Sequence, residues 1–68
     1  MNDEALNGSV RKFLKTVGVN SQLAIEKAVR QALESGQLRG DESMPAHVTL
    51  TVDRLEVDMR FDGELRLT

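Results

Sequence analysis

The sequence contains no cysteine, tryptophan or tyrosine, and its single proline is Pro45. Without cysteine the chain has no disulfide bond, zinc–thiolate site or thiol nucleophile. No apolar run approaches the roughly 18 residues that a membrane-spanning helix needs, so we expect no membrane partner. With 68 residues the chain forms one small domain, which has little material for the shell that supports a catalytic cleft.

Targeting signals are also lacking, because the N-terminal stretch MNDEALNG has neither the basic start nor the apolar stretch of a signal peptide. This predicts a cytoplasmic protein. Apolar residues nevertheless make up 40% of the chain, which is too many for a disordered protein. Phe13 and Phe61 are the only aromatic residues, so the side chains available for a core are mainly aliphatic.

The first part of the chain has the periodicity of an amphipathic helix, predicted over residues 3–17. Asn2 is suited to cap its N-terminus, and Gly18 is predicted to end it in the left-handed conformation. The predicted apolar face consists of Leu6, Val10, Phe13, Leu14 and Val17.

A second amphipathic helix is predicted over residues 21–35, capped by Asn20 or Ser21 and ended by Gly36. Only three residues separate the two predicted helices, so we expect a tight turn between neighbouring, packed helices. The second apolar face consists of Ile25, Ala28, Val29, Ala32 and Leu33.

Residues 36–46 are predicted to form a loop, after which apolar residues recur at every second position, as in strands with one buried face. The parity of this alternation changes at Asp53-Arg54, which predicts a two-residue turn. A second turn is predicted at residues 61–63, with Gly63 in the left-handed position of a bulge.

These turns give a three-stranded antiparallel meander with one apolar and one polar face. The predicted fold is therefore α+β, in the order α-α-β-β-β, with both helices on one face of the meander in a single domain of residues 1–68. The predicted first register pairs residue 50 with 57 and residue 48 with 59. The predicted second register opposes Met59 to Leu65, Val57 to Leu67, Arg60 to Glu64 and Asp58 to Arg66.

Few residues point to catalysis or to a metal. His47 is the only histidine, and its neighbours in the sequence supply neither a nucleophile nor an orienting partner. Asp53, Asp58 and Asp62 do not follow the spacing of a calcium-binding loop. We therefore predict a non-enzymatic protein with no catalytic residue, no metal site and no cofactor.

Nucleic-acid binding is one alternative, because residues 13–29 are compatible with a helix-turn-helix and the predicted hairpin with a winged helix. Residues 1–40 carry six basic and four acidic side chains, whereas residues 41–68 carry three basic and seven acidic ones. The net charge of −2 and the lack of a third helix argue against this alternative. The contact residues would be Arg11, Lys12, Lys15, Gln22, Lys27 and Arg30.

Association with another protein, or with a second copy of the chain, is the main functional prediction. The predicted meander has two edge strands with unpaired backbone groups, which a partner strand or a symmetric dimer would use. We expect exposed apolar contacts at Leu23, at Leu38 and at Phe61, the last at a predicted hairpin tip.

Residues 6–52 also resemble a family of short bacterial proteins of unknown function. The resemblance rests on an RKFLK-VGV-SQ-IEKAV pattern within residues 11–29, on the Pro45-Ala46 pair and on the Thr-Leu-Thr strand at residues 49–51. It implies a small free-standing protein, and it brings no activity, cofactor or catalytic residue.

Overall fold

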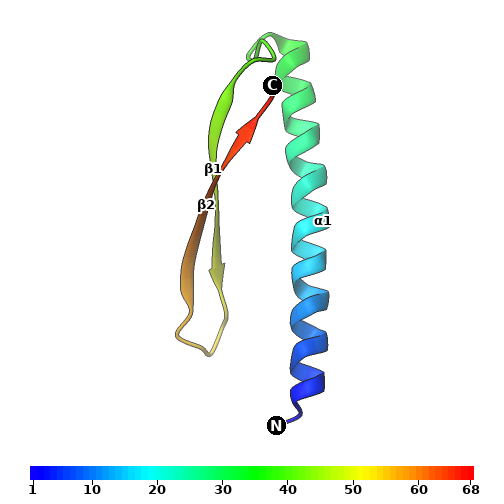
Figure 1. Cartoon of the computed structure of the whole chain (residues 1–68), viewed down its shortest axis with the longest axis vertical. Helices are drawn as coiled ribbons and strands as arrows, with labels where there is room; N and C mark the ends of the chain where they lie inside the picture. The colour runs from blue at the N-terminus through cyan, green and yellow to red at the C-terminus, as the bar shows by residue number, and fades with distance from the viewer. The chain divides into compact units, whose positions relative to one another are not determined.

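The structure, a computed structural model, describes all 68 residues. It contains one helix, α1 (Asp3–Ser35), followed by two strands, β1 (Ser43–Thr51) and β2 (Asp58–Arg66) (Figure 1). The chain divides into two units, residues 1–37 with the helix and residues 38–68 with the strands. The protein is thus α+β, but the prediction of two helices and a three-stranded meander is wrong.

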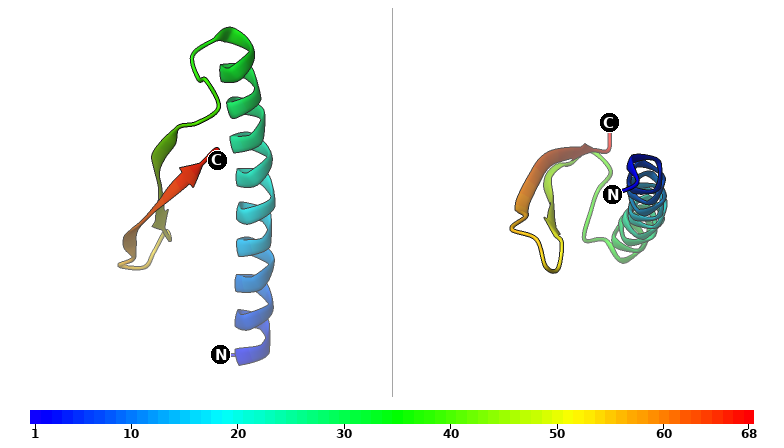
Figure 2. Two further views of the ribbon diagram at one scale, coloured as in Figure 1. Left: turned by 45° about the horizontal axis from the view of Figure 1, so that its top comes forward. Right: turned by 90° about the horizontal axis from the view of Figure 1, so that it is seen from below.

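The helix α1 continues without a break through the position of the predicted turn (Figure 2). Gly18 has a helical backbone and not a left-handed one. Asn20 caps no helix, because its Nδ2 donates a hydrogen bond to the Thr16 carbonyl oxygen four residues earlier, at 2.9 Å. Thr16 Oγ1 donates in the same way to the Lys12 carbonyl oxygen at 3.0 Å. The helix-turn-helix and winged-helix interpretations are therefore wrong.

A continuous apolar face explains why the helix does not end at Gly18. Val17, Ser21 and Ile25 are spaced at i, i+4 and i+8, so they lie on one side of the helix and join the two predicted apolar faces. Two interior glycines, Gly8 and Gly18, cost about 1 kcal/mol each relative to alanine, and no proline interrupts the helix. This face of α1 comprises Leu6, Val10, Phe13, Leu14, Val17, Ser21, Ile25, Ala28 and Ala32.

The two ends of α1 lie where the sequence predicts a start and a stop. Asn2 Oδ1 accepts a hydrogen bond from the Ala5 backbone N–H at 3.1 Å, which satisfies one of the free donors of the first turn. Gly36 has φ +83°, and its N–H donates to the Leu33 carbonyl oxygen at 3.3 Å. The left-handed backbone at Gly36 turns the chain out of the helix.

β1 and β2 are joined by residues 52–57, which form a longer connection than the two-residue loop that was predicted. The tight turn itself is centred on Asp53 and Arg54, as predicted. The Leu55 N–H donates to the Val52 carbonyl oxygen at 3.1 Å, and Arg54 has φ +74°. A left-handed backbone at the third residue of such a turn is usual for glycine, and here it is borne by arginine.

The longer connection changes the register of the hairpin by two positions, so that Leu50 opposes Met59 and not Val57. A shift of two leaves every side chain on its face of the sheet, whereas a shift of one would exchange the faces. The apolar face carries Met44, Ala46, Val48, Leu50, Met59, Phe61, Gly63 and Leu65. The other face carries Ser43, Pro45, His47, Thr49, Thr51, Asp58, Arg60, Asp62, Glu64 and Arg66.

The second predicted turn does not exist, because residues 61–63 lie inside β2. Gly63 opposes Ala46 and has no left-handed backbone, and Phe61 opposes Val48 instead of standing at a hairpin tip. A turn at this point would leave half of β1 without a partner, whereas the straight strand pairs all nine residues of β1. The pairs predicted for a third strand, Arg60 with Glu64 and Asp58 with Arg66, are absent within the chain.

Candidate association surfaces

No residue of the chain is buried, so the apolar faces of both units are its most prominent surface feature. On the face of α1 that the two predicted helices share, the large exposed side chains have between 39% and 53% of their area accessible. At about 1.5 Å per residue, a helix of 33 residues is about 50 Å long. These exposed side chains are Leu6, Val10, Phe13, Leu14 and Ile25.

The hairpin has its own uncovered apolar face. Val48, Met59 and Phe61 each have about half of their area accessible, and no other residue of the hairpin is buried either. A two-stranded hairpin with an open face is marginally stable in water, and a helix gains most of its stability from packing of its apolar side. Both units therefore need a covering surface.

The free edges of the hairpin differ from each other. The Leu67 N–H donates to the Glu42 carbonyl oxygen at 3.1 Å, which continues the register and shows which residue pairs exchange backbone hydrogen bonds. By this alternation Pro45, opposite Glu64, belongs to a pair without such bonds, so its missing N–H lies on the free edge of β1. Proline is tolerated on a free edge and hinders pairing there. The free edge of β2 contains no proline.

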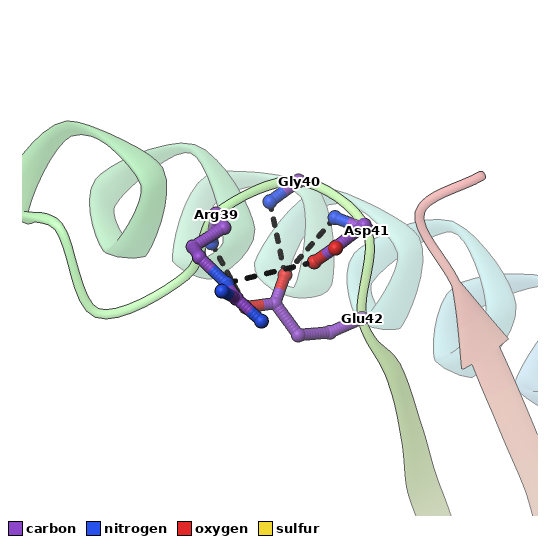
Figure 3. A network of polar contacts seen from close by, with 4 residues as sticks. All are labelled: Arg39, Gly40, Asp41 and Glu42. Carbon is purple, nitrogen blue, oxygen red and sulfur yellow. Dashed lines mark hydrogen bonds and ion pairs between the residues drawn. The ribbon is translucent and has the colours of Figure 1, made fainter.

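A polar network orders the loop between α1 and β1 (Figure 3). The Glu42 carboxylate accepts hydrogen bonds from the backbone N–H groups of Arg39 at 2.8 Å, Gly40 at 2.9 Å and Asp41 at 3.2 Å. The bonds from Arg39 and Gly40 are the main reason why the pKa of Glu42 is lowered. The carboxylate thus fills the concave backbone itself and holds the loop that leads into β1.

The six residues predicted to contact nucleic acid lie on one helix and not on two. Glu26 engages two of them: Gln22 Nε2 donates to its Oε1 at 2.9 Å, and Arg30 Nη2 lies 3.7 Å from its Oε2. Since α1 is unbroken, no separate recognition helix exists for a DNA groove. All six are exposed: Arg11, Lys12 and Lys15 in the N-terminal half, and Gln22, Lys27 and Arg30 in the C-terminal half.

The three residues predicted for protein contacts do not form one surface. Leu23 is nine residues from Leu14 and therefore lies on the opposite side of α1. Leu38 is half-buried in the loop after the helix, and Phe61 lies in the middle of the apolar face of β2. The residues that the prediction assigned to a core, such as Leu14, are the ones that form the larger exposed surface. The helical spacing of four residues that continues from Val17 through Ser21 to Ile25 was the sequence signal for this face.

The structure does not bring His47 or the acidic residues together into a metal-binding group. His47 is exposed on the polar face of the hairpin, opposite Asp62. No group of three or more histidine, cysteine, aspartate or glutamate side chains lies close enough to hold a metal ion. The single helix is not apolar enough to cross a membrane.

The two units define a small α+β protein, composed of one amphipathic helix and one two-stranded hairpin whose apolar faces are open. The chain belongs to the family of unknown function DUF6494, which matches residues 1–68. The predicted membership of a family of unknown function is confirmed to that extent. No curated protein and no solved structure matches the chain.

Proposed function

We propose that the protein is a non-enzymatic association protein that acts by binding protein, in the first place a second copy of itself. The observation that supports this proposal is the lack of any buried residue in a chain with two ordered apolar faces. Burial of apolar surface provides about 25 cal/mol per Å² and is the main favourable term in folding and in association. A chain that leaves these faces open in isolation gains most from a partner that covers them.

The dimensions of the two apolar faces favour a second copy. The strands have nine residues each and extend about 30 Å, whereas α1 extends about 50 Å. The apolar face of the helix is therefore longer than the apolar face of one hairpin. A symmetric dimer supplies a second helix and a second hairpin of the same chemistry, and two-fold dimers are the commonest oligomers.

Sedimentation equilibrium tests this function with two matched variants on α1. Leu14 and Leu23 are 53% and 59% exposed, and they lie on opposite sides of the helix. Leu14→Asp places a charge in the apolar face, so we expect it to shift the wild-type oligomer to monomer. Leu23→Asp has the same helix-propensity cost on the polar side and should leave the oligomer intact. A monomeric wild-type protein at every concentration would contradict the proposal. Equal behaviour of the two variants in a dimeric protein would show that the association does not use the apolar face of α1.

A cytoplasmic location and a bacterial origin of the family stay predictions. Fractionation of cells that express the tagged chain tests the location. Recovery of the protein in a membrane or extracellular fraction would contradict it.

A further inference from the structure

The free edge of β2 is a second surface with unused bonding groups. Because the Leu67 N–H donates to the Glu42 carbonyl oxygen, the residues of β2 at every second position, starting from Arg66, direct their N–H and C=O groups away from β1. These groups are available to another strand. The residues concerned are Asp58, Arg60, Asp62, Glu64 and Arg66.

The charges of these five residues are self-complementary. When a second β2 is laid antiparallel to the first with Asp62 opposite Asp62, Asp58 meets Arg66 of the second copy. Arg60 meets Glu64 in the same way, and the two-fold symmetry repeats both pairs. Opposite charges directly across neighbouring strands stabilise the pairing, whereas like charges oppose it. The edge of β1 offers no such pattern, because Pro45, the third residue of β1, has no N–H to donate there.

The apolar face has the same symmetry. In this register Met59 opposes Leu65 of the second copy, and Phe61 opposes Gly63. An aromatic ring across from a strand glycine covers the backbone that the glycine leaves bare. Nothing lies within 4 Å of the position that a Cβ of Gly63 would take, so there is room for the ring beside it.

We propose that two copies of the chain pair β2 with β2, antiparallel, across a two-fold axis at Asp62. The result is a four-stranded sheet in the order β1-β2-β2-β1, with one continuous apolar face. This inference rests on the proposed self-association and specifies where it occurs. The pairs are those that the sequence predicts for a turn at residues 61–63; the chain does not turn there, and the complementarity is met between copies.

The two Asp62 carboxylates meet near the axis, and each has a cation of its own chain beside it. Arg60 Nε donates to Asp62 Oδ1 at 2.9 Å, so the like charges on the axis are compensated within each copy. The same arginine faces Glu64 of the second copy.

A cysteine substitution tests the axis directly, because the chain contains no other cysteine. In a hydrogen-bonded antiparallel pair the Cα atoms are about 5.5 Å apart, which a disulfide spans. Asp62→Cys should therefore convert most of the protein to a covalent dimer under mild oxidation. Thr49→Cys is exposed on the same polar face but on β1. Three strand spacings separate it from its counterpart, and it lies two residues from the axis, so the two positions are about 20 Å apart and should stay uncoupled.

Charge exchange tests the register by a different readout. Arg60→Glu alone and Glu64→Arg alone each place like charges opposite each other twice, and we expect each to raise the dimer dissociation constant about tenfold. An equimolar mixture of the two variants restores both pairs in a heterodimer and should restore the affinity. Lys27→Glu, a charge reversal at an exposed position of α1, should have little effect.

The outcomes separate this inference from the proposed function. The β2 pairing is overturned, and self-association is kept, if the wild-type protein is a dimer and either of two results is found. One is equal cross-linking of the Asp62→Cys and Thr49→Cys variants; the other is a mixture of Arg60→Glu and Glu64→Arg that does not recover the wild-type affinity. A wild-type protein that is monomeric overturns both. Selective cross-linking at position 62 together with recovery in the mixture supports the pairing.

Discussion

At the scale of single residues, Gly18 shows how a helix retains a residue that ends other helices. Its neighbours Val17, Ser21 and Ile25 keep the apolar face in phase, so the helical backbone continues. The side chains of Asn20 and Thr16 donate hydrogen bonds to carbonyl oxygens inside the helix. They are therefore not used to stabilise a turn at this point. The same glycine, in a helix that ended there, would have a left-handed backbone.

The substitution Gly18→Ala distinguishes these two conformations. In the interior of α1 alanine should raise the free energy of unfolding by about 0.5–1 kcal/mol, because it restricts the unfolded chain and its Cβ meets nothing within 4 Å. Urea unfolding followed by circular dichroism at constant protein concentration measures the change. Gly8→Ala, which is equally open, is the matched control. A loss of stability at Gly18 alone would indicate a turn.

Glu42 is the residue whose contribution to stability we expect to depend on pH. Hydrogen bonds from the Arg39 and Gly40 backbone lower the pKa of its carboxyl in the folded state, so the ionised form is favoured by folding. Its contribution to stability is therefore complete above the pKa of the unfolded chain and is lost as the pH falls through the lower, folded pKa.

Amide hydrogen exchange tests this dependence, with exchange rates corrected for the intrinsic effect of pH. The N–H groups of Arg39 and Gly40 should be protected at neutral pH and should lose protection on acidification. Glu42→Gln weakens the acceptor and should lower their protection at neutral pH. Equal protection in the wild type and the variant would show that the carboxylate does not hold the loop.

At the scale of secondary structure, local sequence signals were sufficient to locate the caps of the helix and the hairpin turn. They were insufficient to decide whether a segment continues through a glycine. Asn2, Gly36 and the turn at Asp53-Arg54 lie where predicted, since each depends on neighbouring residues alone. The break at Gly18 and the turn at residues 61–63 were wrong because both depend on what the flanking segments pair with. Periodicity assigned the faces of the hairpin correctly, whereas its register required the length of the connection.

Gly63→Val tests whether residues 61–63 form a strand. Within β2 valine has a higher strand propensity than glycine, and its Cβ meets nothing within 4 Å in its own chain. Opposite Phe61 of the second copy it would form an aromatic–β-branched pair, so we expect stability to be unchanged or raised by up to about 1 kcal/mol. Thermal unfolding at fixed concentration measures the effect. Gly36→Val is the contrasting variant, because φ +83° disfavours a β-branched side chain and should reduce stability. A comparable loss at both positions would favour a turn at Gly63.

At the scale of the whole molecule, the apolar content predicts a core, but neither the helix nor the hairpin buries a residue by itself. Leu14 and Phe13 have the spacing of core residues, and they are more than half exposed. Sequence periodicity identifies which face is apolar, but it does not say whether the covering surface belongs to the same chain. Of the predicted contact residues, Phe61 alone lies on one of the two large apolar faces.

Coupling of folding to association has a consequence for thermal stability. If the native state is a dimer and the unfolded state is a monomer, mass action makes Tm rise with protein concentration. For a dimer of two 68-residue chains, an unfolding enthalpy of about 0.7 kcal/mol per residue gives a rise of roughly 5 °C per tenfold increase in concentration. Differential scanning calorimetry over two decades of concentration measures this slope. The oxidised Asp62→Cys dimer unfolds as one molecule, so its Tm should not depend on concentration. A wild-type Tm that is equally independent would show that one chain reaches its stable fold alone.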